Sequence, residues 1–217
     1  MKTPLTVDKL CDAARIFADQ ESKHDEPSLY GVTDGKAVGT YLEHKFRHRL
    51  EEKYTFVTSS SAKGIDFPGL AVDIKVTSIT QPQSSCPFRT ARQKVFGLGY
   101  SLLLFVFEKA DNEKRRTARL NILHAVFIEK KRTEDYQMTT GLLQILKNNG
   151  NEDDLAAFMM DKNLPADDVQ ARKIAVEILK TPPEVGYLTI SNALQWRLQY
   201  SRVIEQAGKV GGIIRVR

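Results

Sequence analysis

The segment that decides the expected fold reads KGIDFPGLAVDIKVT, residues 63–77. Its second half is rich in β-branched side chains and predicts a strand, on which alternation places Asp73 and Lys75 on one face. The pair Pro68-Gly69 predicts a turn before this strand, because proline restricts φ and glycine accepts a positive φ. The turn brings Asp66 back toward Asp73. We therefore expect a hairpin that holds two carboxylates and an ammonium in one small volume.

These residue types suit a divalent cation and a phosphate. The carboxylates of Asp66 and Asp73, with the backbone carbonyl of Ile74, are ligands that Mg²⁺ prefers, and substrate phosphate and water complete its shell. Such an ion polarises a phosphoryl group and acidifies a bound water. Lys75 would orient or deprotonate the attacking water and offset charge in the transition state. The residues therefore predict metal-dependent cleavage of a phosphodiester; the alternative is a chance pattern on a solvated strand face.

A further carboxylate lies on the helix expected over residues 34–50. The apolar side chains of this helix recur in steps of four, at Val38, Leu42, Phe46 and Leu50. Glu43 borders that stripe, and the helix leads into the hairpin, so we expect Glu43 to lean over the metal-binding edge of the sheet. The alternative is an ordinary surface pair between Glu43 and Arg47, four residues further on.

In this order, four residues resemble the site of the PD-(D/E)xK nuclease superfamily: Glu43, Asp66, Asp73 and Lys75. More narrowly, VGTYLE at 38–43 followed by DFPGLAVDIK at 66–75 is similar to the mismatch-repair strand-nicking endonuclease and its GATC-cutting restriction relatives. In that branch a helix ending in Leu-Glu precedes a hairpin that begins with Asp-Phe and has the same short gap. The resemblance covers about residues 36–79.

The resemblance implies that Asp66 and Asp73 bind the metal, that Lys75 is catalytic and that Glu43 is an accessory acid. The chain departs from the pattern at Ile65, where the superfamily has its namesake proline, and at Asp73, where the nearest relatives often have glutamate. The gap between Glu43 and Asp66 is also longer than in the nicking enzyme. The variations at Ile65 and Asp73 leave the chemistry possible, and the longer gap weakens the match at Glu43 in particular. What the resemblance carries over is the class of reaction, with no target sequence attached.

The rest of the chain predicts an α/β fold, with a restriction-endonuclease-like core of a mixed β-sheet flanked by helices and a helical C-terminal extension. After the hairpin we expect a helix at 89–98, a buried strand at 100–108, a charged turn at 109–119 and a strand at 120–128. Helices are expected at 133–148, 152–162 and 166–180, a strand at 187–190, and a last helix from Ser191 or Asn192 to Ala207. We expect one nuclease domain over 1–217, with a core at about 34–130 and a recognition or dimerisation region at about 131–217.

The charge distribution agrees with a nucleic-acid partner. The 217 residues carry a formal charge of +5, and the sequence pI near 9.1 favours a polyanion. The residues expected to contact DNA lie near the hairpin and in the last helix: Lys36, Gln81, Gln83, Arg89, Arg92, Lys94, Arg197 and Arg202. The alternatives are a plain surface loop for the glutamines, solvated helix faces for the basic residues, and a last helix that only packs on the core.

These observations favour a type II restriction endonuclease that uses Mg²⁺ to cut double-stranded DNA at a specific short sequence. The alternatives are a mismatch-repair-type nicking enzyme and a non-catalytic DNA-binding module on the same fold. Cutting a palindrome on both strands calls for a homodimer, and a cognate DNA methyltransferase would act on the same site. No run approaches a transmembrane span, and Cys11 and Cys86 have no ligand-spaced partners, so we expect a cytoplasmic protein without a membrane partner.

Overall fold

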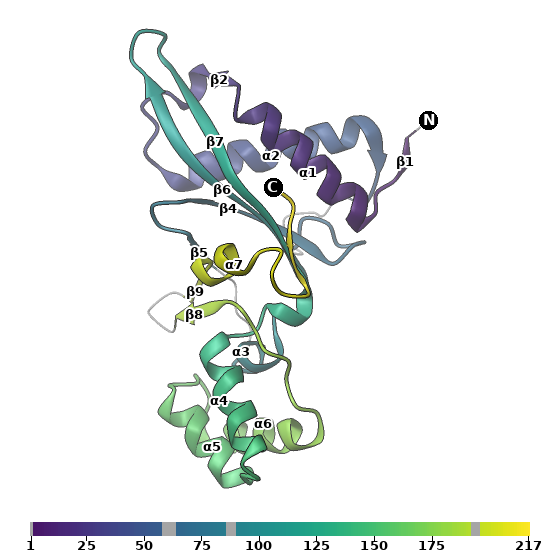
Figure 1. The fold of residues 1–217 in the computed structure, drawn as a ribbon, viewed down its shortest axis with the longest axis vertical. Coiled ribbons are helices and arrows are strands. Elements are labelled where there is room, and N and C mark those ends of the chain that lie inside the picture. The colour runs from purple at the N-terminus through teal and green to yellow at the C-terminus, as the bar shows by residue number, and fades with distance from the viewer. Residues whose placement is uncertain (1, 58–63, 86–89, 192–195) are drawn as a thin grey trace. The chain divides into compact units, whose positions relative to one another are not determined.

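The computed structural model describes residues 2–57, 64–85, 90–191 and 196–217. The chain forms two compact units (Figure 1). The first unit comprises Met1–Gln83, Leu102–Ile128 and Gln206–Arg217, and the second comprises Ser84–Ser101 and Glu129–Glu205. Helices flank a mixed sheet, so the α/β class predicted from the sequence is confirmed. Within the described residues, no helix is long and apolar enough to cross a membrane.

The sheet of the first unit has the strand order β10-β7-β6-β4, and β2 also pairs with β7. Its members are β2 (Asp25–Glu26), β4 (Val72–Ser78), β6 (Ser101–Asn112), β7 (Thr117–Ile128) and β10 (Ile213–Arg215). β6 and β7 form a long antiparallel ribbon, paired from Leu102 opposite Ile128 to Asn112 opposite Thr117, with a shift of register between Val106 and Phe107. The predicted strands are confirmed, whereas the charged turn is much shorter than predicted, covering residues 113–116. Charged side chains are tolerated in this ribbon because each strand satisfies the backbone of the other and, on β7, exposed Arg119 alternates with buried Ala118 and Leu120.

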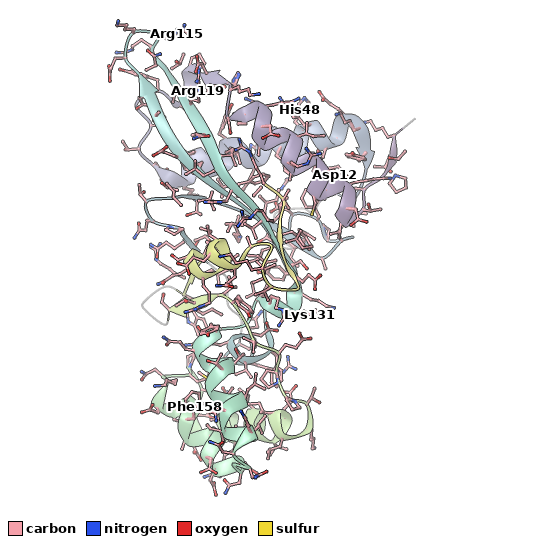
Figure 2. All side chains as sticks on the ribbon, in the orientation of Figure 1. Asp12, His48, Arg115, Arg119, Lys131 and Phe158 are labelled. Atoms are coloured by element: carbon pink, nitrogen blue, oxygen red, sulfur yellow. The ribbon has the colours of Figure 1, made fainter. Side chains whose placement is uncertain are left out.

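Arg115 and Arg119 lie at the far part of this ribbon (Figure 2). Both pair with Asp25 of β2, with nitrogen–oxygen distances of 3.2 and 2.7 Å. These ion pairs link β2 to the exposed face of the ribbon, beside the core residues Ala118 and Leu120.

Two long helices pack on this sheet, α1 (Val7–Glu21) against β7 and α2 (Gly35–Lys53) against β4. Phe17 of α1, Phe46 of α2 and Phe105 of β6 meet in the core, with ring centroids 5.1–5.9 Å apart. Side chains cap both helices: Thr6 accepts from the N–H of Lys9, and Asp34 accepts from those of Lys36 and Ala37. Short elements complete the unit: β1 (Thr3–Pro4), which pairs with β3 (Tyr54–Thr55), and the 3₁₀ turn η1 (Pro27–Leu29). The position of α2 is the one predicted, and it sets the position of Glu43.

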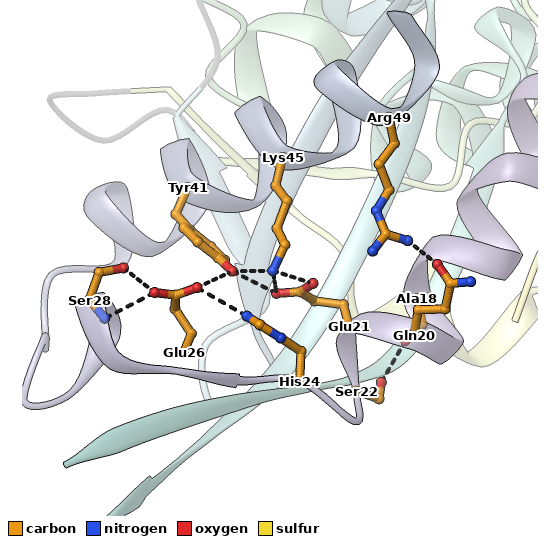
Figure 3. Close-up of polar contacts among 10 residues, drawn as sticks. All are labelled: Ala18, Gln20, Glu21, Ser22, His24, Glu26, Ser28, Tyr41, Lys45 and Arg49. Carbon is orange, nitrogen blue, oxygen red and sulfur yellow. Dashed lines mark hydrogen bonds and ion pairs between the residues drawn. The ribbon is translucent and has the colours of Figure 1, made fainter. Parts of the chain in front are cut away.

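A polar cluster fixes α2 against the end of α1 and the strand that follows (Figure 3). Glu21, at the end of α1, is 1% exposed and accepts a hydrogen bond of 3.1 Å from the ammonium of Lys45. The Tyr41 hydroxyl lies 3.0 Å from a carboxylate oxygen of Glu21 and 2.9 Å from one of Glu26. Because a buried charge is tolerated only with such partners, these contacts hold α2 in one orientation.

The second unit is largely helical. It contains α3 (Arg92–Phe96), η3 (Lys130–Arg132), α4 (Tyr136–Lys147), α5 (Glu152–Asp161), α6 (Asp168–Lys180) and α7 (Ser201–Gln206). The second small sheet has three strands in the order β5 (Gln83–Ser85), β9 (Arg197–Gln199) and β8 (Thr189–Ser191). The three central helices lie where the sequence predicted them. Asn151 and Asp154 form a reciprocal capping box on α5, and Asp167 caps α6.

The predicted last helix is wrong in its first half. Residues 197–199 form strand β9, antiparallel to β8 with Ile190 opposite Leu198, and helix α7 begins only at Ser201. Leu198 and Tyr200 are buried while their neighbours are half-exposed, so the segment alternates with the period of a strand. Asn192 and Gln195 of the predicted helix lie outside the described residues.

Candidate active site

The predicted hairpin is present immediately before and along β4. Phe67 and Val72 form an antiparallel bridge, with N–H to O distances of 2.9 and 3.2 Å in the two directions. The N–H of Leu70 closes the turn by donating to the Phe67 carbonyl at 3.0 Å. The positive φ falls at Ala71 (51°) and not at Gly69, where the turn residues predicted it. A left-handed residue directly before β4 allows the Val72 N–H to reach the same Phe67 carbonyl.

Alternation along β4 separates its side chains as predicted. Val72 and Ile74 are at most 1% exposed and belong to the core of the first unit. Asp73 and Lys75 share the other face, where the Lys75 ammonium lies 2.7 Å from a carboxylate oxygen of Asp73. Their side chains are only 6% and 19% exposed. The strand therefore presents a paired carboxylate and ammonium at a largely desolvated position.

Asp66 joins this pair through the hairpin backbone. Its Oδ2 accepts a hydrogen bond of 2.8 Å from the N–H of Ile74, and its own N–H lies 3.4 Å from Oδ1 of Asp73. Its Oδ1 forms an ion pair with the guanidinium of Arg47 on α2. The structure thus brings Asp66, Asp73 and Lys75 together, as the sequence predicted.

Glu43 faces the same group of charges from α2. Its pKa is raised to about 7, first by burial and then by repulsion from Asp66 and Asp73, with Lys75 and Arg47 opposing part of the rise. Arg47, one helical turn further on, forms its ion pair with Asp66. The alternative of a plain surface pair between Glu43 and Arg47 therefore does not describe this helix. The sequence identified Arg47 as that possible partner and as one of the basic residues of 36–53 that could neutralise phosphates, and its four-residue spacing from Glu43 was the available sign that it faces the site.

Several carboxyl groups lie close together at the hairpin, and burial together with their mutual repulsion shifts the pKa values of the site. Burial, together with the neighbouring Asp66, raises the pKa of Asp73 to about 6, although Lys75 pulls it down. Burial disfavours the Lys75 ammonium, but the carboxylates of Asp73, Glu43 and Asp66 outweigh it and raise the pKa of Lys75. Lys75 is therefore a stable cation, whereas the pKa values of Glu43 and Asp73 lie above the usual range of carboxyl groups.

The residues present fit a hard divalent cation. Across the described ranges, no three acidic, histidine or cysteine side chains are already arranged to share one ion. Mg²⁺ requires only one or two carboxylates when phosphate oxygens and water fill its remaining positions. Asp66, Asp73 and the Ile74 carbonyl offer oxygen ligands of this kind at one end of β4. A cation there would also relieve the repulsion that raises the pKa of Glu43 and Asp73.

Comparison with known proteins identifies the family. A sequence model described as type II restriction enzyme NspV matches residues 4–215. The type II restriction enzyme NspV of Nostoc sp. (strain ATCC 29411 / PCC 7524) is 64% identical over 214 residues, which cover 99% of this chain and 97% of that protein. This chain belongs to the NspV family of type II restriction enzymes. No solved structure matches it. The family match includes both units, and the hairpin lies well inside it.

The other residues predicted to contact DNA in this NspV family member fall into different environments. In the first unit Lys36 is exposed in the first turn of α2. Gln81 is exposed and Gln83 half-buried, and the Thr77 hydroxyl lies within hydrogen-bond distance of both backbone carbonyl oxygens, at 3.1 and 3.0 Å. The loop that carries the two glutamines is thereby tied to the end of β4, in which Thr77 lies.

In the second unit the predicted residues have structural contacts. Arg92 donates to Glu177 of α6 at 2.9 Å, and Lys94 is 6% exposed, with its pKa lowered by burial. The Arg202 guanidinium lies 3.7 Å from the centroid of the Tyr136 ring, and Arg197 is half-buried in β9. Arg89 lies outside the described residues. DNA contact by these residues stays a prediction.

Proposed function

We propose that this chain is a type II site-specific deoxyribonuclease of the PD-(D/E)xK type, which hydrolyses double-stranded DNA at a short sequence with Mg²⁺ as cofactor. Membership of the NspV family supports the class of reaction. The observation that carries the assignment of residues is the convergence of Asp66, Asp73 and Lys75 on one hairpin, with Glu43 facing them from α2. A non-catalytic binding module has no need for such a costly cluster of buried charges.

Each residue has a distinct role in this proposal. Asp66, Asp73 and the Ile74 carbonyl hold Mg²⁺, which when bound supplies Lewis acidity toward the scissile phosphate. Lys75, a stable cation fixed 2.7 Å from Asp73, orients the attacking water and offsets the negative charge that grows on the phosphoryl oxygens. Glu43, which faces Asp66 and Asp73 from α2, is the accessory acid that assists proton transfer near the scissile bond.

DNA recognition follows from charge and surface chemistry. We assign phosphate contacts to Lys36, Arg89 and Arg92, and base contacts to Gln81, Gln83, Arg197 and Arg202. The amides of the two glutamines offer the donor and acceptor pair that reads adenine. Cutting both strands of a palindrome requires two copies of the site. The proposed active species is therefore a homodimer whose two-fold axis matches that of the DNA. A cognate DNA methyltransferase that modifies the same sequence would protect the host genome.

The test is digestion of several bacterial genomic DNAs and a supercoiled plasmid, with Mg²⁺ and with EDTA. We expect discrete linear fragments with one common end sequence in Mg²⁺ and intact DNA in EDTA. Asp73→Ala should be inactive, and Asp12→Ala, which removes the same charge from an exposed position of α1, should cut like the wild type. Nicked circles without linear product would instead support the mismatch-repair type of reaction. Intact DNA across all substrates would refute the nuclease.

A further inference from the structure

Arg47 occupies the position from which it controls Asp66. It lies on α2 one turn after Glu43, and its guanidinium forms an ion pair with Oδ1 of Asp66, with side-chain exposures of 27% and 17%. The other oxygen of Asp66 accepts from the Ile74 N–H at 2.8 Å. Both oxygens of this carboxylate are therefore engaged by the protein itself. A cation that binds Asp66 must displace or share one of these partners.

The guanidinium of Arg47 is incompletely satisfied in this arrangement. Its Nε is buried and has no hydrogen-bond partner. A buried donor without an acceptor costs free energy, and guanidinium has five donors in a planar fork that suits phosphate oxygens. Arg47 thus has donors to spare for an anion that enters the site, and a phosphodiester offers the matching pair of acceptors.

The charges around Asp66 determine how readily a cation can bind there. Three carboxyl groups meet two fixed cations at the site, and the cation nearest to Asp66 is Arg47. Without DNA, the positive charge of Arg47 repels a divalent ion from Asp66 and competes with it for Oδ1. A phosphate that enters the site would offer the guanidinium a second anionic partner and would free Oδ1 of Asp66 for the metal.

We propose that Arg47 is a positioning residue that holds Asp66 in the free protein and turns to the scissile phosphate when DNA binds, so that substrate and cation enter the site together. This inference rests on the proposed function. This role explains why Arg47, which lies on α2 and outside the hairpin, forms an ion pair with the proposed metal ligand Asp66. Because DNA binding and cation binding are then linked, the free protein binds the cation weakly and the complex with DNA binds it more tightly.

The test measures Mn²⁺ binding by calorimetry to the DNA-free protein at fixed ionic strength. Arg47→Met should bind Mn²⁺ about tenfold more tightly than the wild type, since one like charge within several ångströms of a divalent ion is removed even if the site is screened as in water. Arg47→Lys keeps the charge and should bind close to the wild-type level. The matched control is Arg49→Met on the same helix, where the guanidinium contacts Gln20 and the Phe17 ring; its affinity should stay within about twofold of the wild type.

A purely structural role for Arg47 predicts the opposite sign, because losing a partner of Asp66 would disorder the site and weaken Mn²⁺ binding. Unchanged or weaker binding by Arg47→Met would therefore overturn the inference. If Arg47→Met does not fold, as judged by its melting transition, Arg47→Gln supplies a neutral side chain that still donates to Asp66, and it should also bind more tightly.

Asp73→Asn separates this inference from the proposed function. We expect it to lower Mn²⁺ affinity in both the wild-type and Arg47→Met backgrounds. If Asp73→Asn lowers the affinity while Arg47→Met leaves it unchanged, the metal site stands and only the role of Arg47 is refuted. If Asp73→Asn has no effect in either background, these carboxylates do not bind the metal, and the proposed function fails together with the inference.

Discussion

Replacement of Glu43 by glutamine removes one of three crowded carboxyl groups while keeping the size of the side chain, and we expect it to stabilise the metal-free protein above neutral pH. The pKa of Glu43 is raised from 4.5 to about 7, chiefly by burial and then by Asp66. The folded protein therefore holds this proton more tightly than the unfolded chain does. The resulting loss of stability begins as the pH rises through 4.5, grows until about 7, and is constant at higher pH.

The structure sets the size of the effect. A rise in pKa from 4.5 to about 7 corresponds to a loss of at most about 3.5 kcal/mol at pH 8, at about 1.4 kcal/mol for each pH unit. Because Glu43 is only half-buried, solvent screening reduces the expected effect to about 1–2 kcal/mol. Glutamine carries no titrating proton, so the variant escapes this loss, and its advantage should vanish near pH 4.5.

The assay is urea unfolding of the wild type and Glu43→Gln in EDTA at pH 4.5, 6, 7 and 8, with the difference in unfolding free energy plotted against pH. Glu51→Gln, at an exposed position of the same helix, is the control and should show no pH-dependent difference. A Glu43→Gln difference that does not change with pH, or a variant less stable than the wild type at pH 8, would refute the view that Glu43 is crowded by the carboxylates of the site.

Two further predictions concern packing. Phe46→Ala should lower the unfolding free energy by about 3–5 kcal/mol, because its ring is fully buried between two others. The control, Ile16→Ala at a 42% exposed position, should lower it by less than about 1 kcal/mol. Equal losses in the two variants would contradict the assigned core. Gly97→Ala should cost about 2 kcal/mol or more, since φ is +80° and a Cβ would lie 2.9 Å from oxygens of Glu134 and Thr133. Urea unfolding measures the unfolding free energy of all three variants. If Gly97→Ala leaves this free energy unchanged, the backbone geometry described at Gly97 is wrong.

The hairpin could be predicted because its determinants are local. Strand alternation alone places Asp73 beside Lys75, and the turn returns Asp66 over a gap of a few residues. The partner of Asp66 could not be predicted in the same way. The ion pair with Arg47 depends on how α2 packs on the sheet, which is decided by core contacts such as Phe46 on Phe105.

Helix α1 was missed, although its sequence carried a helix signal. Leu10, Ala14 and Phe17 recur at helical spacing after the capping residue Thr6, but the buried face ends in Glu21, whose burial makes sense only once Tyr41 and Lys45 are in place. The error in the last helix has a different cause. The segment at 197–200 has too few residues to separate a helical period from a strand period, and pairing with β8 decides the outcome.

The most direct test of the central claim is single-turnover cleavage of a DNA duplex containing the mapped target by Lys75→Met, with duplex binding measured in parallel by fluorescence anisotropy. Methionine keeps most of the apolar stem and removes the ammonium that lies 2.7 Å from Asp73. We predict that cleavage falls by about a hundredfold or more while DNA affinity changes by less than about threefold, and that Lys180→Met, at the exposed end of α6, matches the wild type. Cleavage close to the wild-type rate, or loss of binding in step with cleavage, would contradict the assignment of Lys75 to the chemistry of the hairpin.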